Sequence, residues 1–150
     1  MHKSSWTIKK AIREIVVLAV MFIVIYFGNQ QVQTWLGKRA IAAMNFENIS
    51  FDTALERAQQ ENKPILADFS AVWCPSCRKI DTRILAQDDI HERISEDYVF
   101  VRLEYESDDR ALFEHYKVNS FPTLLVLDQN GGVQRKLSLS YNKDAFASEL

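Results

Sequence analysis

The chain of 150 residues has little of several features that mark special classes of protein. It contains only two cysteines, too few for a scaffold that disulfides hold together. Its four glycines and three prolines exclude a collagen-like fibre and low-complexity linkers. Apolar residues make up 47% and charged residues 25%, the usual balance of a chain that buries a core. That balance excludes a disordered tail and a membrane protein with many spans.

The net charge of −2 hides an uneven distribution of charge along the chain. Residues 1–40 carry six bases against one acid, a net charge of +5. Residues 41–150 carry twelve bases against nineteen acids, a net charge of −7. Because a nucleic-acid-binding surface needs clustered positive charge, the acidic residues 41–150 are poorly suited to bind nucleic acid. We expect no nucleic-acid partner.

One long hydrophobic run, Ile15 to Phe27, contains no charged residue. A transmembrane helix needs about twenty residues, so the run is short by itself. Trp6 and Trp35 lie on either side of it, and a helix joining them would rise roughly 43 Å, close to the thickness of a bilayer with its headgroups. We therefore predict a cytoplasmic tail and membrane anchor over residues 1–36, with the span at about 12–35.

Two alternatives to an anchor are a cleaved signal peptide and a buried helix of a soluble domain. A signal peptide is disfavoured because residues 26–30 make a poor cleavage site and Ala40-Ile41-Ala42 lies too far along. A buried helix is disfavoured because the run has no polar face at helical period. Four bases precede the run, Lys3, Lys9, Lys10 and Arg13, and two follow it, Lys38 and Arg39. This bias predicts a cytoplasmic N-terminus and a C-terminal domain in an oxidising compartment.

The rest of the chain reads as a linker, residues 37–47, and one α/β domain, residues 48–150. Periodicity and turn residues predict alternating helices and strands. Helices are expected from Ser50 or Asp52 to Asn62 and over 74–86, 88–95, 108–116 and 143–150; strands over 65–70, 98–103, 124–127 and 133–139, the last two joined by a hairpin turn at Asn130-Gly131. Such an order packs as a central mixed β-sheet flanked by helices, with a right-handed crossover joining the first two strands.

The most informative motif is Cys74-Pro75-Ser76-Cys77, placed at the start of a predicted helix. Two thiols three residues apart at a helix start can approach closely enough to bridge. Unpaired N–H groups and the helix dipole favour an anion there, so the pKa of Cys74 should fall below about 8.5. Cys74 would then attack a substrate disulfide, and Cys77 would resolve the mixed disulfide. Pro75 suits the first turn, where no N–H is needed.

The same spacing of cysteines occurs in zinc sites and in inert buried pairs. Zinc normally needs a second pair of ligands, and His91 and His115 would serve only if the fold brought both close; each is more readily a surface histidine. The alternative function is a tethered, non-enzymatic binding or assembly module whose dithiol holds copper or a client protein. No methionine or histidine lies near the pair in sequence to support it, because Met44 precedes the domain. We expect no metal and no other cofactor.

Three segments carry a resemblance to a known family. They are Ala67-Asp68-Phe69-Ser70-Ala71-Val72-Trp73-Cys74-Pro75-Ser76-Cys77-Arg78, the stretch from Tyr116 to Leu125, and Asn130-Gly131-Gly132-Val133. Together they resemble the thioredoxin superfamily, over about 100 residues from the helix near Asp52 to the end. The sequence around Lys63-Pro64 and Trp73-Cys74 is similar to that of the C-terminal domain of the DsbD-type transmembrane disulfide reductases.

This resemblance implies a thioredoxin-like fold and the activity of a protein-disulfide oxidoreductase. It favours reduction of substrate disulfides over their formation. It also implies protein thiol or disulfide substrates, a membrane electron donor, and a single-pass protein of the bacterial inner membrane with a periplasmic domain. The residues between the cysteines, Pro75 and Ser76, depart from the family's usual Gly-Pro. That departure leaves the direction of the redox reaction open.

The resemblance also implies a role for individual residues. Asp68 would be a buried acid with a raised pKa that exchanges a proton with Cys77, and otherwise a solvated aspartate at a strand end. Arg102 stands where the family often has a lysine near that acid, and is otherwise a surface arginine. Pro122 would follow a cis peptide beside the dithiol, and Trp73 would shield the sulfurs or pack in the core. The implied substrate-binding residues are Trp73, Pro75, Ser120, Phe121 and Pro122.

Overall fold

The centre of the protein is a four-stranded β-sheet. The computed structural model describes the backbone of residues 3–107 and 109–150, and the side chains of residues 8–107 and 109–150. The strands lie in the order β2-β1-β3-β4, with bounds Val99–Glu104, Ile65–Ser70, Thr123–Leu127 and Val133–Lys136. β1 pairs with β2 in parallel and with β3 antiparallel, and β3 and β4 form an antiparallel hairpin. The predicted mixed sheet is confirmed.

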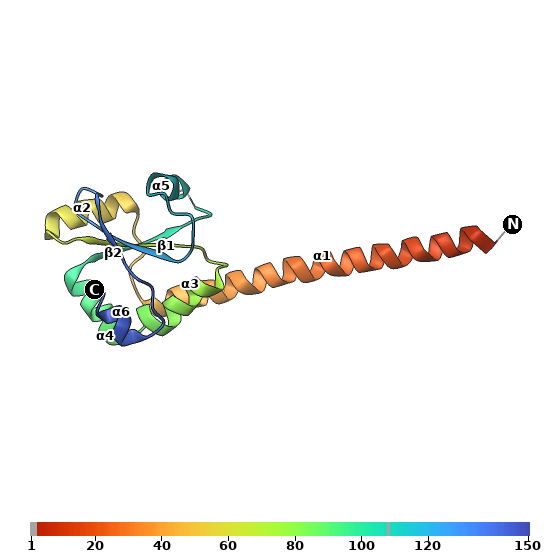
Figure 1. Cartoon of the computed structure of the whole chain (residues 1–150), viewed down its shortest axis with the longest axis horizontal. Coiled ribbons are helices and arrows are strands. Elements are labelled where there is room, and N and C mark those ends of the chain that lie inside the picture. The colour runs from red at the N-terminus through yellow and green to blue at the C-terminus, as the bar shows by residue number, and fades with distance from the viewer. Residues whose placement is uncertain (1–2, 108) are drawn as a thin grey trace.

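Helices cover both faces of this sheet (Figure 1). In chain order they are α1 Lys3–Met44, α2 Phe51–Glu61, α3 Pro75–Ile80, the π-helix η1 Asp81–Leu85, α4 Asp88–Asp97, α5 Arg110–His115 and α6 Lys143–Ala147. Ser50, one of the two predicted starting residues, is the N-cap of α2, because its side-chain oxygen accepts a hydrogen bond from the N–H of Thr53. The predicted order of elements after residue 45 is therefore confirmed.

Several element boundaries differ from the prediction. The predicted helix 74–86 consists of α3 followed by one π-helical turn. β4 ends at Lys136 rather than 139, because the chain leaves β3 once Leu137 has donated its N–H to Leu124 and entered the core. α5 begins at Arg110, after a turn in which Ser107 bonds to both Glu104 and Asp109. The first residue of that predicted helix, Asp108, lies outside the described residues.

Alternate residues of β1 and β2 point to opposite faces of the sheet, as pleating requires. On one face, six strand residues pack against α2 and α5: Ile65, Ala67, Phe69, Val99, Val101 and Leu103. On the other face, Leu66 and Phe100 join the core formed with η1, α4 and α6. The positions that follow on this second face, Asp68 and Arg102, are polar. This alternation places the polar residues of both strands beneath α3 and η1.

The helix α1 runs without interruption and extends far beyond the rest of the molecule (Figure 1). By length and composition, its part from Ile8 to Met44 suffices to cross a bilayer; the most apolar window has a mean hydropathy of 2.2 and none of it is buried. A buried core helix is therefore not what this run forms. Trp35 is exposed, with the guanidinium of Arg39 over its ring, and the side chain of Trp6 lies outside the described residues.

The segment 37–47, predicted as a linker, is helical up to Met44. Ala40 and Met44 are buried, and Met44 belongs to the core cluster on the dithiol face, so this methionine does not precede the domain. Gly37 lies against the backbone carbonyl of Val72, and a side chain there would collide with it. The last turns of α1 are thus packed on the domain because their small and apolar residues recur at helical spacing.

Candidate active site

The two cysteines lie at the N-terminus of α3 and form a disulfide. Cys74 is the N-cap residue, and its sulfur accepts a hydrogen bond from the N–H of Cys77, 3.2 Å away. Pro75 occupies the first helical position, as predicted. The first turn of a helix carries unpaired N–H groups and a partial positive charge. In the reduced protein both effects stabilise a thiolate on Cys74.

The two sulfurs are unequally accessible. Cys77 is completely buried, whereas Cys74 keeps 5% of its surface exposed between the exposed residues Trp73 and Pro75. The hydroxyl of Ser76 lies 3.3 Å from the Cys74 sulfur and is a second hydrogen-bond partner for it. Cys74 is therefore the more accessible of the two sulfurs, and it is the one that the N-terminus of α3 contacts. The contact of Ser76 was not predicted.

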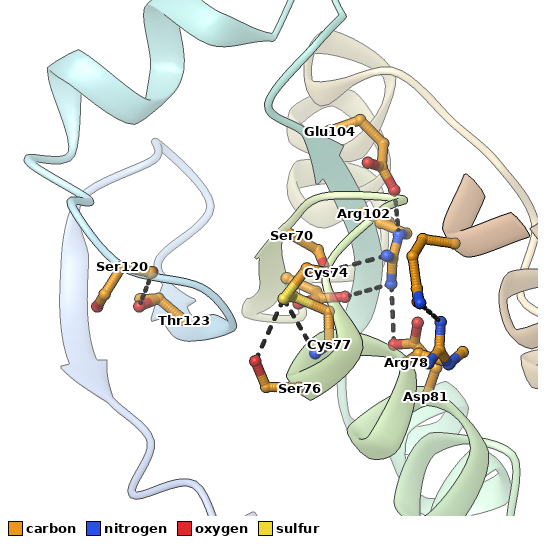
Figure 2. The surroundings of a disulfide bond; sticks show 12 residues. Ser70, Cys74, Ser76, Cys77, Arg78, Asp81, Arg102, Glu104, Ser120 and Thr123 are labelled. Atoms are coloured by element: carbon orange, nitrogen blue, oxygen red, sulfur yellow. Dashed lines mark hydrogen bonds and ion pairs between the residues drawn. A yellow bond between two sulfur atoms is a disulfide. The ribbon is translucent and has the colours of Figure 1, made fainter. Parts of the chain in front are cut away.

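A cluster of charged side chains, of which Asp68 and Asp81 are buried, lies beside the dithiol (Figure 2). Its centre is the guanidinium of Arg102, which is only 7% exposed and donates four hydrogen bonds. Nη1 reaches Asp68 Oδ2 and Asp81 Oδ1, both at 2.9 Å. Nε reaches Glu104 at 2.6 Å, and Nη2 reaches the Ser70 hydroxyl at 2.9 Å. The side chain of Arg102 is therefore nearly enclosed, and the alternative of a surface arginine does not hold.

The strands explain why these side chains meet. Asp68 is the register partner of Arg102, and Ser70 that of Glu104, across the parallel pair β1 and β2. All four point to the same face because they lie two residues apart on each strand. Asp81 approaches from η1, four residues after Cys77 and on the same side of the helix. Asp81 was not predicted, although an acid at that spacing from a buried cysteine is the signal that could have found it.

The charges of this cluster do not balance, since three carboxyl groups surround one guanidinium. Burial raises the pKa of Asp68 to about 7, opposed by Arg102 and reinforced by the charges of Asp81 and Glu104. Burial likewise raises the pKa of Asp81 to about 6, again opposed by Arg102. Burial lowers the pKa of Arg102, but the three carboxylates outweigh it and hold that pKa above its ordinary value. Near neutral pH, protonated and ionised Asp68 are therefore both populated, and this carboxyl group can take up or release a proton.

Asp68 has one oxygen free for that proton. Its Oδ2 is bonded to Arg102, whereas its buried Oδ1 has no hydrogen-bond partner in the part of the chain that the structure describes. A buried carboxyl oxygen without a partner favours the protonated form. Asp68 is thus buried as the resemblance implies, and it is not a solvated residue at a strand end.

The predicted substrate-binding residues lie on the other side of the dithiol. The Phe121–Pro122 peptide is cis, as predicted, and Phe121 packs against the two cysteines. The rings of Trp73 and Phe121 lie edge to face, 6.3 Å apart, and Trp73 remains 36% exposed rather than packed in the core. Ser120 is exposed, and its carbonyl already accepts a hydrogen bond from the Thr123 hydroxyl (Figure 2).

His91 and His115 take part in other contacts. The ring of His91 stacks on Phe46, and that of His115 lies edge-on to Tyr116. Among the described residues, no three His, Cys, Asp or Glu side chains are grouped so as to hold a metal ion. The arrangement at α3 is therefore suited to thiol chemistry with a buried proton acceptor.

The sequence is similar to known proteins. The model of the thioredoxin-like domain family matches residues 51–150. The thiol:disulfide interchange protein DsbD of Salmonella paratyphi A is 29% identical over 112 residues, which are 71% of this chain and 20% of DsbD. This chain therefore spans about one fifth of that relative's length. The disulfide bond reductase DsbH of Chlamydia pneumoniae is 29% identical over 104 residues, 62% of this chain and 63% of DsbH.

The fold agrees with solved structures as well. A DsbH oxidoreductase superposes with a TM-score of 0.63 at 24% identity, over 69% of this chain and 81% of that one. At this identity the likeness concerns the fold alone. With the helix-capping dithiol, the buried acid beside it and the match over residues 51–150, the chain belongs to the thioredoxin-like domain family.

Proposed function

We propose that this protein is a membrane-anchored thiol–disulfide oxidoreductase that reduces disulfides of proteins outside the cytoplasm. The observation that carries the proposal is the Cys74–Cys77 disulfide at the N-terminus of α3, placed beside the buried acid cluster. The names of the relatives, a thiol:disulfide interchange protein and a disulfide bond reductase, support the same chemistry. Cys74, Cys77 and Asp68 are the proposed catalytic residues.

The first step starts from the reduced protein. The Cys74 thiolate attacks one sulfur of a substrate disulfide, and a mixed disulfide forms between Cys74 and the substrate. The substrate's S–S bond breaks, and its other sulfur leaves as a thiolate that takes up a proton. The N–H groups of α3 stabilise the attacking thiolate. Trp73, Pro75, Ser120, Phe121 and Pro122 are proposed to hold the substrate chain.

The second step resolves the mixed disulfide. The Asp68 carboxylate takes the proton of the Cys77 thiol, and the Cys77 thiolate attacks the Cys74 sulfur. The Cys74–Cys77 disulfide forms, the second substrate thiolate leaves, and two electrons have passed to the substrate. A dithiol of a membrane protein then reduces the Cys74–Cys77 disulfide by the reverse exchange. A pKa near 7 suits Asp68 to both directions of proton transfer.

The proposed location rests on α1. Its apolar part fits a single span, with residues 1–36 as cytoplasmic tail and anchor and the domain in the periplasm of a bacterium. The bases that precede the span outnumber those that follow it, which favours a cytoplasmic N-terminus. An extracytoplasmic reductase needs electrons from a membrane partner, and a chain with this anchor stays within reach of one.

The Cys74→Ser variant tests the proposal. In the full chain in detergent, reduction of insulin disulfides should fall by at least about a hundredfold, because the attacking thiolate is lost. Cys77→Ser is the matched control: it should still form the mixed disulfide but no longer release it. Unchanged turnover in Cys74→Ser would rule out this function. A metal bound to the purified protein in equal amount and resistant to mild chelation would favour the copper-binding alternative.

A further inference from the structure

The anchor helix forms one wall of a cleft beside the attacking cysteine. The cleft has a volume of about 240 Å³ and is lined by Asn29, Gln30 and Gln33 of α1 and by Trp73 and Pro75, the two neighbours of Cys74 in sequence. Gln33 is tied to the active-site helix, because its side-chain oxygen accepts a hydrogen bond of 2.7 Å from Arg78. The proposed active-site loop therefore lies directly against α1.

This contact is fixed by the packing that follows it along α1. Gly37 lies against the carbonyl of Val72, in the active-site loop, at a separation that no side chain would allow. Ala40 and Met44, one and two turns further, are buried in the domain. Because α1 is one uninterrupted helix, the position of the dithiol along the membrane normal follows from the position of the span.

The height of the cleft relative to the membrane can be counted along the helix. The predicted span of about 12–35 ends at Trp35, and Gln33 and Asn29 lie two and six residues before it. At the rise of an α-helix, the cleft therefore lies about 3 to 9 Å on the bilayer side of Trp35. The headgroup layer on each side of a bilayer is roughly 5 to 7 Å thick. The cleft therefore opens at the membrane surface, where an exposed tryptophan such as Trp73 is favourably placed.

We propose that this cleft receives a cysteine-bearing segment of an integral membrane protein, held at the level of the lipid headgroups. The proposal rests on the proposed function and specifies its partner. Asn29 offers a donor and an acceptor to the backbone of an extended segment, and Gln30 offers its side-chain oxygen while its amide group donates to the Tyr26 hydroxyl. The Gln33 oxygen already accepts from Arg78 and serves to hold the active-site helix against α1. A partner confined to the same bilayer presents its sulfur at the depth of Cys74, whereas a soluble protein has to approach with the membrane on one side.

The first experiment changes the height of the domain and nothing else. Seven residues of helical sequence inserted between Phe27 and Gly28 add two turns, about 10 Å, and nearly preserve the rotational phase. The same insertion between Ile8 and Lys9 is the control, because it lies before the span. In nanodiscs, the substrates are insulin and a single-span peptide with a disulfide at its membrane surface.

The raised variant should reduce the membrane-held disulfide at least about tenfold more slowly than the wild type, with insulin reduction unchanged. Equal rates on both substrates would overturn the proposal. If the wild type reduced neither substrate, the proposed function would fail, and depth would still be tested by fluorescence. With Trp6 and Trp35 replaced by phenylalanine, Trp73 should be quenched by lipids brominated near the headgroup, and not in the raised variant; equal quenching would contradict the proposal.

The second experiment tests the wall itself. Asn29→Ala combined with Gln30→Ala should slow reduction of the membrane-held disulfide about five- to tenfold through lost hydrogen bonds, and leave insulin reduction unchanged. Gln31→Ala is the matched control, because Gln31 is exposed on the same turn and does not line the cleft. A loss equal to that of the control would show that the α1 wall binds no partner.

Discussion

The two faces of the sheet use the same strands for different purposes. Ile65, Ala67 and Phe69 of β1 face α2 and α5, where the buried residues are apolar except for the uncharged Thr123 opposite Phe69. Between them, Asp68 and Ser70 face α3, where Arg102 joins three carboxyl groups. The first face obtains its stability from burial of apolar surface, and the second combines burial with unbalanced charge. The difference indicates that pH acts on one face only, and the following predictions test it.

The largest effect on stability is expected from Arg102→Met, which keeps the volume and removes the charge. At pH 8 the free energy of unfolding of the oxidised protein should fall by about 3–5 kcal/mol, because buried carboxylates lose their partner. At pH 5 the loss should be smaller, since Asp68 and Asp81 can take up protons. Urea unfolding at both pH values measures this. A loss independent of pH would mean that Arg102 acts by packing alone.

A pH-dependent effect of opposite sign is expected from Asp68→Asn. Burial raises the pKa of Asp68 in the folded protein from 3.8 to about 7, so the folded state binds a proton that the unfolded state releases. This contribution to stability is complete below pH 3.8 and is lost as the pH rises to about 7. The Asp68→Asn variant lacks this pH-dependent loss. At pH 8 its free energy of unfolding should exceed that of the wild type by on the order of 1–3 kcal/mol.

The same variant should be slower in catalysis. Without the Asp68 carboxylate, release of substrate from the mixed disulfide should slow by on the order of a hundredfold. Rapid mixing of the reduced protein with a disulfide peptide resolves this step from the initial attack. A variant that is more stable at pH 8 and equally fast would leave Asp68 a structural residue only.

The smallest effect is expected on the apolar face. Ile65→Val removes one methylene group from a fully buried side chain and should cost about 0.5–1.5 kcal/mol. The cost should be the same at pH 5 and pH 8, because α2 and α5 bring no buried charge to this face. A pH-dependent cost would show that the two faces are coupled, and the comparison between them would then fail.

The local parts of the site could be predicted from the sequence. Cys74-Pro75-Ser76-Cys77 after a short apolar run places a dithiol at a helix N-terminus, since each residue suits its position in the cap. The buried cluster could not be predicted in the same way. Whether Arg102 reaches Asp68 depends on the register of two strands 34 residues apart in sequence, which no local pattern determines.

The packing of α1 was missed for a different reason. Residues 37–47 were predicted as a linker, and Lys38 and Arg39 within them are exposed. The opposite side of the same helix carries Gly37, Ala40 and Met44 at spacings of three and four residues. That helical face is visible in the sequence, but such small residues mark a contact only once a partner surface is known.

The uninterrupted course of α1 has a consequence for orientation as well as for height. A hinge between anchor and domain would let the domain turn freely above the membrane. Because the helix is continuous, a rotation of the span about its own axis rotates the domain, and with it the opening of the active site, by the same angle. A neighbouring transmembrane helix that packed against α1 inside the bilayer would thereby fix the direction in the membrane plane in which the two sulfurs face.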